Sequence, residues 1–372
     1  MKVLYGVQGT GNGHITRARA MAPELARAGI QVDYLFSGRP RERLFDMAPF
    51  GDFQHRDGLT FAVREGRIHP LATLRECRPL TFIRDIRALD LDSYDLILSD
   101  YEPITAWAAR LRKRPVIGLG HQYAFRHPVP QYRGNPGQRW LMRGFAPAAT
   151  TLGLHWHHFN QPILPPIAPV ASHQLSLERG LILVYLPFES IAAIVALLGQ
   201  FDGHRFAVYH PDALEARSTG HRQSHVQWHP PCRDGFQADL LRCEGVVCNA
   251  GFELASETLQ LGKKLLVKPV AGQPEQYSNA LALDLLGYGH TMAELSADKV
   301  RRWLASASGT RIRYPNVAAE ICAWLTAGAS EPIADLAARL WRSTELPDLT
   351  PATRTDVDLP VHPRPARHRS HG

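Results

Sequence analysis

The sequence predicts an α/β protein with two Rossmann-like lobes, each built on a parallel sheet, that face one another across a cleft. Apolar, β-branched runs alternate with helical segments along most of the chain, which is typical of parallel, doubly wound sheets. The same alternation restarts near residue 181, after a proline-rich crossing. A length of 372 residues is also long for a single domain and favours two.

The first lobe is expected at residues 1–160. Its first strand, at residues 2–7, leads through a glycine loop into a helix in which Pro23 is expected to introduce a kink or a new start. The second strand is predicted at residues 30–36, and residues 53–69 are interpreted as an irregular β excursion. Further along, we expect helices at 80–90 and just after 103, and buried strands at 95–98 and 115–120.

A stiff linker is expected at residues 161–178, because four prolines between positions 162 and 169 favour an extended chain. Three histidines precede it, His155, His157 and His158. They are considered as metal ligands, but no carboxylate stands near them in the sequence, so a metal site is not favoured.

The second lobe is expected at residues 179–328. Strands are predicted at 181–186, 205–210, 225–228, 245–248 and 265–268, and helices at 189–199, 234–241, 296–306 and 314–326, besides the two considered below. Residues 329–346 carry apolar side chains at helical spacing and are predicted to pack back across the lobes. Residues 347–372, rich in Pro, Arg and His, are expected to form a disordered tail.

The net charge of +7 is unevenly distributed. Residues 1–160 hold 22 Lys/Arg against 14 Asp/Glu (+8), residues 161–349 hold 16 against 19 (−3), and the tail holds 4 against 2 (+2). A basic first lobe suits an anionic acceptor or a phospholipid surface, and the alternative is an Arg-rich composition spread over solvated faces. Nucleic acid is not expected as a partner, because no aromatic–basic interleaving accompanies the charge.

A cytoplasmic location is expected from the cysteines and the N-terminus. The five cysteines are odd in number and include no C-x-x-C pair, so reduced thiols are the default. The apolar run at residues 1–7 is too short for a signal peptide, and no stretch of 18 apolar residues occurs. Peripheral attachment to the inner face of the plasma membrane stays open.

Gln8 to His14 form a glycine loop between the first strand and the first helix. A strand–loop–helix arrangement suits a phosphate, because the first N–H groups of a helix lack partners. The spacing Gly9-x-Gly11-x-Gly13 matches neither the dinucleotide fingerprint nor a P-loop, since no Lys-Ser/Thr pair follows. The loop therefore predicts a phosphate contact without an NAD or ATP signature.

The stretch from Asn249 to Ala280 reads as strand end, glycine turn, helix, strand, polar loop and helix. Both helix starts are expected to face the crevice at the carboxyl ends of neighbouring parallel strands, where open α/β sheets bind ligands. The first helix start offers N–H groups for a phosphate. Glu257, Glu275 and Gln276 could reach hydroxyls. Phosphate donors beside hydroxyl-binding carboxylates predict a nucleotide-sugar site.

These residues resemble the GT-B glycosyltransferases. The resemblance rests on the paired lobes, the Gly-Thr-Gly-Asn-Gly-His loop, and the pattern from Gly251 through Ser256-Glu257, Pro269 and Glu275-Gln276-Tyr277 to Asn279-Ala280. It extends over roughly residues 1–345 but is tight only at 6–20 and 245–288. Within the fold, the chain is similar to the glycosyltransferase 28 branch, which holds the peptidoglycan N-acetylglucosaminyltransferase and the diacylglycerol galactosyltransferases. Ser99 to Pro103 and the His-x-x-Phe-x-x-Pro crossing resemble a prokaryotic subgroup.

The resemblance implies roles for individual residues. Glu257 matches the glutamate that binds the ribose hydroxyls of UDP, Glu275 and Gln276 match the pair that reads the donor sugar, and Gly251 opens the diphosphate-binding helix. The donor-binding set expected on this basis is Gly11, Asn12, Gly13, Asn249, Gly251, Phe252, Ser256, Glu257, Gln273, Glu275, Gln276 and Asn279. The chain departs from its nearest branch in having no proline after His14, and Glu275 stands where the peptidoglycan enzyme has glutamine.

Glycosyl transfer requires a base for the acceptor hydroxyl, and His14 and Asp100 are the candidates. His14 follows a glycine turn at a helix start, which favours its neutral, proton-accepting form. Its alternative role is a cap or a phosphate contact. Glu102 and His121 also follow strand ends and are candidates for the acceptor side. Asp100 and Glu102 could instead cap the next helix, and a polar loop residue is favoured over a catalytic one for His121.

No metal or other cofactor is expected, and a nucleoside-diphosphate sugar is the expected co-substrate. Asp-x-Asp pairs occur only at Asp90/Asp92, before a strand, and at Asp356/Asp358, in the tail. The leading hypothesis is an inverting hexosyltransferase that moves a sugar from a UDP-sugar to an unidentified acceptor, either anionic or lipid-linked. The alternatives are a nucleotide-sugar epimerase or hydrolase, and a non-catalytic nucleotide-sugar binding protein.

Overall fold

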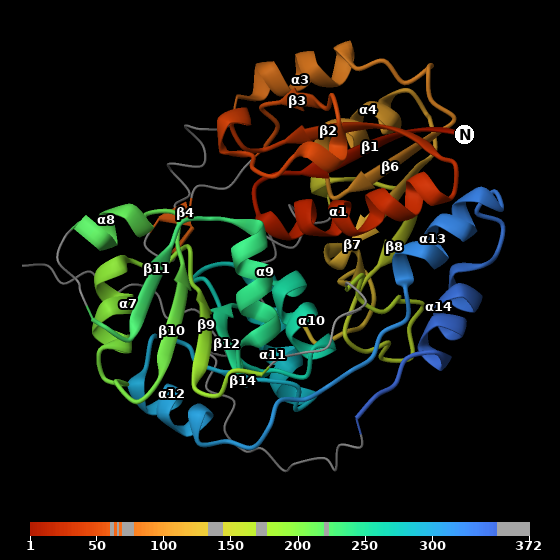
Figure 1. Ribbon diagram of the computed structural model, residues 1–372. Coiled ribbons are helices and arrows are strands. Elements are labelled where there is room, and N and C mark those ends of the chain that lie inside the picture. Colours follow the sequence, from red (N-terminus) through yellow and green to blue (C-terminus); the bar gives the residue numbers. More distant parts are fainter. Residues whose placement is uncertain are drawn as a thin grey trace, which may run out of the picture.

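The computed structural model describes residues 1–59, 63–64, 67–68, 78–132, 144–168, 177–218 and 223–347. Within these ranges the chain forms two α/β lobes, each built on a six-stranded parallel sheet (Figure 1). Both sheets have the strand order of a Rossmann fold, in which the order reverses beside the first strand of the lobe. The predicted fold class is confirmed.

The first sheet is ordered β3-β2-β1-β6-β7-β8. Its order reverses between β1 and β6, where Val3 is in register with Val32 on one side and with Leu96 on the other. The carboxyl ends of β1 and β6 therefore open side by side at the edge that faces the second lobe. The strands are β1 (Lys2–Gln8), β2 (Gln31–Ser37), β3 (Gln54–Arg56), β6 (Leu96–Asp100), β7 (Val116–Gly120) and β8 (Thr150–Gly153).

Helices cover both faces of this sheet because its strands are apolar on both sides. Val3 and Tyr5 share a buried cluster with Ile15 of α1, whereas Leu4 packs with Ile104 on the opposite face. In Figure 1, α1 lies between the first sheet and the second lobe, and α3 and α4 lie on the far side. The helices are α1 (Asn12–Arg27), α3 (Pro79–Ala88), α4 (Pro103–Leu111) and α5 (His121–Ala124), with 3-10 turns at Arg41–Arg43 and Ala48–Phe50.

The second sheet is ordered β11-β10-β9-β12-β13-β14, and its order reverses between β9 and β12. Its strands are β9 (Leu181–Tyr185), β10 (Arg205–Tyr209), β11 (Val226–His229), β12 (Gly245–Asn249), β13 (Lys264–Lys268) and β14 (His290–Thr291). The helices of this lobe are α7 (Ile191–Leu198), α8 (Ala213–Ser218), α9 (Arg233–Arg242), α10 (Phe252–Gln260), α11 (Pro274–Leu285) and α12 (Ala297–Leu304).

The last two helices return to the first lobe. α14 (Ile333–Arg342) buries Leu336 and Leu340, and the Trp341 indole donates to the carbonyl oxygen of Ile163 over 2.6 Å. α13 (Val317–Thr326), which was expected within the second lobe, packs against α1 instead. Ahead of it, the Asn316 amide donates to Glu24 of α1 over 2.9 Å. The chain thus crosses back one helix earlier than expected.

The structure differs from the expected elements at several short segments. α1 continues through Pro23 without interruption. Within the excursion expected at 53–69, β3 joins the main sheet, and β4 (Val63–Arg64) and β5 (Arg67–Ile68) form a small hairpin. β8, α5, α8 and β14 were not predicted, because two to six residues give too little periodicity. The tail from residue 348 and linker residues 169–176 lie outside the described ranges.

Candidate active site

Two helix starts from different lobes meet in the cleft. α1 begins at the carboxyl end of β1 with Gly11 as its N-cap, and α10 begins at the carboxyl end of β12 with Gly251 as its N-cap. Neither start receives a side-chain cap, so the first N–H groups of both helices are not bonded by a capping residue. Such starts attract anions.

His14 and Asp100 form a close pair at this point. α1 carries His14 in its first turn, and β6 ends at Asp100, so the His14 Nδ1 lies 2.6 Å from Asp100 Oδ1. Asp100 is fully buried, and Arg17 Nη1 donates to the same oxygen over 2.7 Å. Because a carboxylate accepts at Nδ1, that nitrogen carries the proton and Nε2 is the basic nitrogen. The two alternative candidates for the base are thus one hydrogen-bonded unit.

Arg17 also ties this unit to the second lobe. Its Nε donates over 3.0 Å to Glu253, in the first turn of α10, and its Nη2 forms an ion pair with the same carboxylate. All three side chains of this Asp100–Arg17–Glu253 chain are buried. Burial raises the pKa of the Glu253 carboxyl, and Arg17 opposes that rise. Contact here is tight, since a Cβ added at Gly13 would lie 3.1 Å from Glu253 Cγ.

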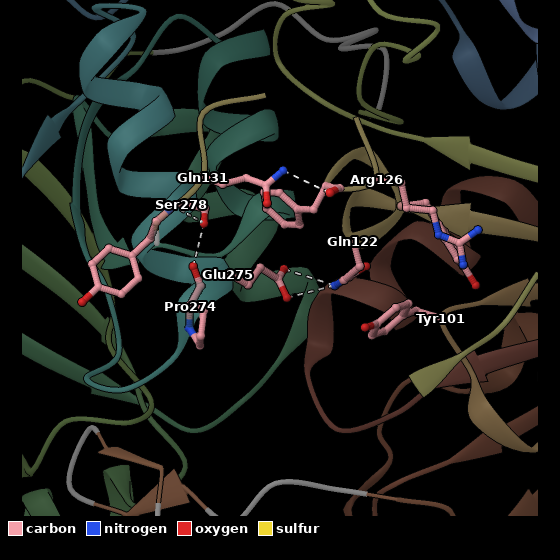
Figure 2. Close-up of a pocket in the computed structure, with 10 residues that line it drawn as sticks. Tyr101, Gln122, Arg126, Gln131, Pro274, Glu275 and Ser278 are labelled. Atoms are coloured by element: carbon pink, nitrogen blue, oxygen red, sulfur yellow. Dashed lines mark hydrogen bonds between the residues drawn. The ribbon is translucent and has the colours of Figure 1, made fainter. Parts of the chain in front are cut away.

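A pocket opens between the β6–α4 turn, α5 and the loop after it in the first lobe, and the start of α11 in the second (Figure 2). Gln122 and Glu275 point toward one another across it, and the Gln122 Nε2 donates to both Glu275 oxygens, over 3.1 and 3.2 Å. The lining residues are Tyr101, Gln122, Tyr123, Phe125, Arg126, Gln131, Tyr132, Pro274, Glu275 and Ser278.

Glu257 lies one turn further into α10, with its carboxylate buried. Its partner is Gln237 of α9, whose amide donates over 3.0 Å. Burial raises the pKa of the Glu257 carboxyl to about 7, and the Gln237 hydrogen bond opposes this. A carboxyl poised near neutrality can accept a hydroxyl hydrogen bond, and it does so most strongly when ionised.

The other expected donor residues of the second lobe lie mostly beneath the cleft surface. The Ser256 hydroxyl accepts from the Trp156 indole, the side-chain oxygen Oε1 of Gln276 accepts from the Val270 N–H, and the Asn279 side-chain amide donates to the Ala250 carbonyl oxygen. Gln273 is the partly exposed N-cap of α11. These contacts fix the walls of the cleft.

Three further expected donor residues contact other elements from the ends of α1, β12 and α10. Asn12 links the lobes, because its amide donates to Tyr185 of β9 over 2.8 Å and its oxygen accepts from Arg39. Asn249 donates to Glu189 and to the Lys268 carbonyl oxygen, and its own buried side-chain oxygen has no partner. Phe252 stacks on His121 with ring centroids 4.0 Å apart.

The structure corrects the expectation that Glu102 and His121 face an acceptor. Glu102 is fully buried and caps α4, where it accepts from the N–H groups of Ile104 and Thr105. His121 is fully buried at the lobe junction, with its ring nitrogens 2.8 Å from the Leu154 carbonyl oxygen and 2.6 Å from Asn279. Both are structural groups. Burial lowers the pKa of His121 and raises that of Glu102.

Sequence reasoning missed Arg17, Glu253 and Gln122. Arg17 follows His14 by three positions and so shares its helix face, which was a usable signal. Glu253 stands two positions after Gly251, in the first turn of α10, and this position was also a usable signal. Gln122 gave no signal, because the short helix α5 that orients it cannot be recognised from four residues.

Within the described ranges, no three His, Cys, Asp or Glu side chains are grouped so that they could hold a metal ion, and His155, His157 and His158 form no such group. None of the helices in these ranges is long and apolar enough to span a bilayer.

A family model described as "Glycosyl transferase family 1" matches residues 1–141 and 158–307. The chain belongs to this glycosyltransferase family. An uncharacterized glycosyltransferase of Methanosarcina acetivorans is 30% identical over 128 residues, a match that spans 33% of this chain and only 32% of that relative.

Solved glycosyltransferases share the two-lobe GT-B fold with this family member. Spinosyn rhamnosyltransferase SpnG, complexed with spinosyn aglycone, superposes with a TM-score of 0.53 at 13% identity, over 91% of this chain and 97% of that one. SnogD from Streptomyces nogalater gives a TM-score of 0.51 at 17% identity, over 92% and 99% of the two chains. At these identities the likeness concerns the fold alone.

Proposed function

We propose that this glycosyltransferase moves a hexosyl group from a nucleoside-diphosphate sugar to an acceptor hydroxyl, with inversion and without a metal. The observation that carries the proposal is the His14–Asp100 pair beside two uncapped helix starts. The base and the anion-binding groups that the reaction needs are thereby close together. Resemblance further favours the glycosyltransferase 28 branch and a UDP-sugar.

The chemistry follows from the positions of these groups. The acceptor oxygen attacks the anomeric carbon of the donor while its proton passes to His14 Nε2, and the bond from that carbon to the diphosphate oxygen breaks. Asp100 holds the ring and stabilises the imidazolium that forms. The free N–H groups of α10 receive the negative charge that develops on the diphosphate. A single displacement of this kind inverts the anomeric centre.

The donor side is tested by thermal-shift titration with UDP, TDP and a panel of their sugars. TDP is included because SpnG and VinC, whose folds are similar, have been crystallised with thymidine diphosphates. We expect stabilisation by one nucleotide series and a loss of that response in Glu257→Ala, but not in Glu294→Ala, which removes an exposed carboxylate. The absence of stabilisation by every nucleotide would contradict the donor assignment.

The base is tested once a turnover assay exists for the donor so found. His14→Ala and Asp100→Asn should each lower kcat by about 10²–10⁴-fold with little change in nucleotide affinity, because general-base catalysis acts only in the transition state. Wild-type kcat in His14→Ala would exclude His14 as the base. Rapid product formation without any acceptor would favour a hydrolase or epimerase.

For the acceptor we propose an anionic or lipid-linked molecule held by the basic first lobe, with the protein peripheral to a membrane. The support is the charge of +8 over residues 1–160. Co-sedimentation with vesicles of phosphatidylglycerol, compared with phosphatidylcholine, tests it. Binding should need the anionic lipid and weaken with added salt, and equal binding to both vesicles would contradict the proposal.

A further inference from the structure

Gln122 lies where the two lobes, the base and the pocket meet. It is the second residue of α5, which starts directly at the end of β7, and its side chain is buried. Its Nε2 lies 3.4 Å from His14 Nε2 and 3.1 Å from the nearer oxygen of Glu275. One amide group therefore contacts both the proposed base and a residue expected to read the donor sugar.

The orientation of this amide is determined by its neighbours. An amide oxygen turned toward the Glu275 carboxylate would be repelled, so the nitrogen must face it. His14 donates from Nδ1 to Asp100, which leaves Nε2 with a lone pair. The amide of Gln122 thus offers one N–H to Glu275 and another to His14 Nε2, and it covers the atom that must receive the acceptor proton.

The same arrangement leaves the amide incompletely satisfied. Gln122 Oε1 is buried and has no hydrogen-bond partner. A buried acceptor without a donor costs free energy, and proteins rarely retain one without a reason. A hydroxyl carries one proton, so an acceptor hydroxyl that takes the place of the amide beside His14 can donate it to Nε2, and the displaced amide is then free to find a donor for its oxygen.

We propose that Gln122 is a positioning residue that shields the base until the acceptor hydroxyl displaces it. This rests on the proposed function of the His14–Asp100 pair. The acceptor would come through the pocket between Tyr101, Phe125, Arg126 and Tyr132, and displacement of the amide would free Glu275 for the donor sugar (Figure 2). Until the acceptor binds, the lone pair of His14 Nε2 is hydrogen-bonded to Gln122 and is not available to a water molecule. Hydrolysis of the donor is therefore slow.

The shield can be tested on the protein without any substrate. Diethyl pyrocarbonate acylates free imidazole nitrogen, and peptide mapping by mass spectrometry gives the rate at His14. We expect Gln122→Ala to raise that rate about fivefold, because the alanine removes a hydrogen bond to Nε2 and such a bond contributes about 1 kcal/mol. Gln200→Ala, which removes an exposed amide of the second lobe, should leave it unchanged. The rate at the distant His204 serves as an internal check of folding.

A second measurement follows the chemistry. With the UDP- or TDP-sugar that stabilises the protein, Gln122→Ala should release nucleotide without acceptor roughly tenfold faster than wild type, a smaller factor than the roughly 10²–10⁴ that a general base itself contributes. In this hydrolysis the water oxygen bonds to the anomeric carbon, its proton goes to His14, and the bond to the diphosphate breaks. The added His14→Ala change should abolish the gain.

Two results would overturn the shield. The first is equal acylation of His14 in wild type and Gln122→Ala, and the second is equal hydrolysis in both proteins when both bind nucleotide. The proposed function fails differently, by the absence of stabilisation with every nucleotide. In that case the acylation rates still decide whether Gln122 covers His14.

Discussion

At the scale of single residues, two glutamates of α10 are buried in surroundings that disfavour their ionised form. Burial raises the pKa of Glu253 and Glu257, and in each case one hydrogen-bonding partner, Arg17 or Gln237, limits the rise. Glu257 reaches about 7. A group of this kind destabilises the folded protein when it is ionised, and it binds a ligand that donates hydrogen bonds more strongly for the same reason.

This predicts a pH-dependent stability that depends on Glu257. Below an ordinary value of 4.5 the carboxyl is protonated in both the folded and the unfolded protein. Between pH 4.5 and about 7 the carboxyl ionises in the unfolded chain but stays protonated in the folded protein, so the free energy of unfolding falls as pH rises. Once the pH is above 7, the total loss is at most about 3 kcal/mol. Glu257→Gln should therefore gain in Tm over wild type at pH 8, and little at pH 5.

The control is Glu294→Gln, which makes the same substitution at an exposed position. If the difference for Glu257→Gln were the same at pH 5 and pH 8, the carboxyl would be ionised normally and the account of its burial would be wrong.

His14 and Asp100 show how far single residues could be predicted. Each follows a strand end, and that pattern is visible in the sequence. Their hydrogen bond was not, because it depends on the register of β1 beside β6, with Val7 opposite Asp100. The distinction between Asp100, which contacts His14, and Glu102, which caps α4, also depends on backbone direction. Tyr101 between them has a positive φ of 52°.

At the scale of elements, β1 and α4 approach one another unusually closely. A Cβ added at Gly6 would lie 2.2 Å from the Thr105 hydroxyl oxygen and 2.9 Å from a Glu102 carboxylate oxygen. Both groups are buried and hydrogen-bonded to one another as the cap of α4. The glycine is therefore required by packing, because a side chain at this position of β1 would collide with the start of α4. Gly6 also pairs with Ser99 of β6, the strand that ends in Asp100.

Gly6→Ala should accordingly destabilise the first lobe by about 1–3 kcal/mol, the usual range for overpacking, or more if the cap of α4 is broken. The lower free energy of unfolding is measured by chemical denaturation. Gly203→Ala is the matched control, because a Cβ there meets no atom within 4 Å. Equal stability of the two variants would show that α4 moves away freely.

Elements with a long apolar period were predicted from the sequence, and short ones were not. β1, β2, β6, β9 and β12 are buried runs, and the segments that became α10 and α11 carry a glycine turn or a proline at the start. α5 and β14 are defined by neighbours that are distant in sequence: β8 for α5, and β13 for β14. A pattern within a few neighbouring residues carries no information about these contacts, so it cannot predict the elements that depend on them.

At the scale of the whole molecule, the two lobes are joined at the site itself. Arg17 and Glu253 are 236 positions apart and are buried against one another, and Arg17 simultaneously holds Asp100. The sequence predicted a cleft between two lobes but not this contact, because no pattern within one lobe specifies its partner in the other. Through Arg17, the start of α10 and the base of the reaction belong to one charge network.

Arg17→Met should therefore lower the free energy of unfolding more than any other substitution proposed above. It leaves two buried carboxylates without their cation, and breaking a buried ion pair costs about 3–5 kcal/mol. Glu253→Gln should cost less, since Arg17 keeps Asp100. Because the pair joins the lobes, Arg17→Met should also raise the radius of gyration measured by small-angle scattering, which a defect inside one lobe would not do.

Arg313→Ala is the control for Arg17→Met, because it removes an arginine from an ion pair at the surface and not from one between the lobes. Arg313 pairs with Glu345 over 2.9 Å, but both side chains are more than half exposed, and exposed pairs contribute at most about 1 kcal/mol. If Arg17→Met were no less stable than Arg313→Ala and kept the wild-type radius, the lobes would be held by other contacts. The Asn12–Tyr185 bond and the stacking of His121 on Phe252 would then be the contacts to remove next.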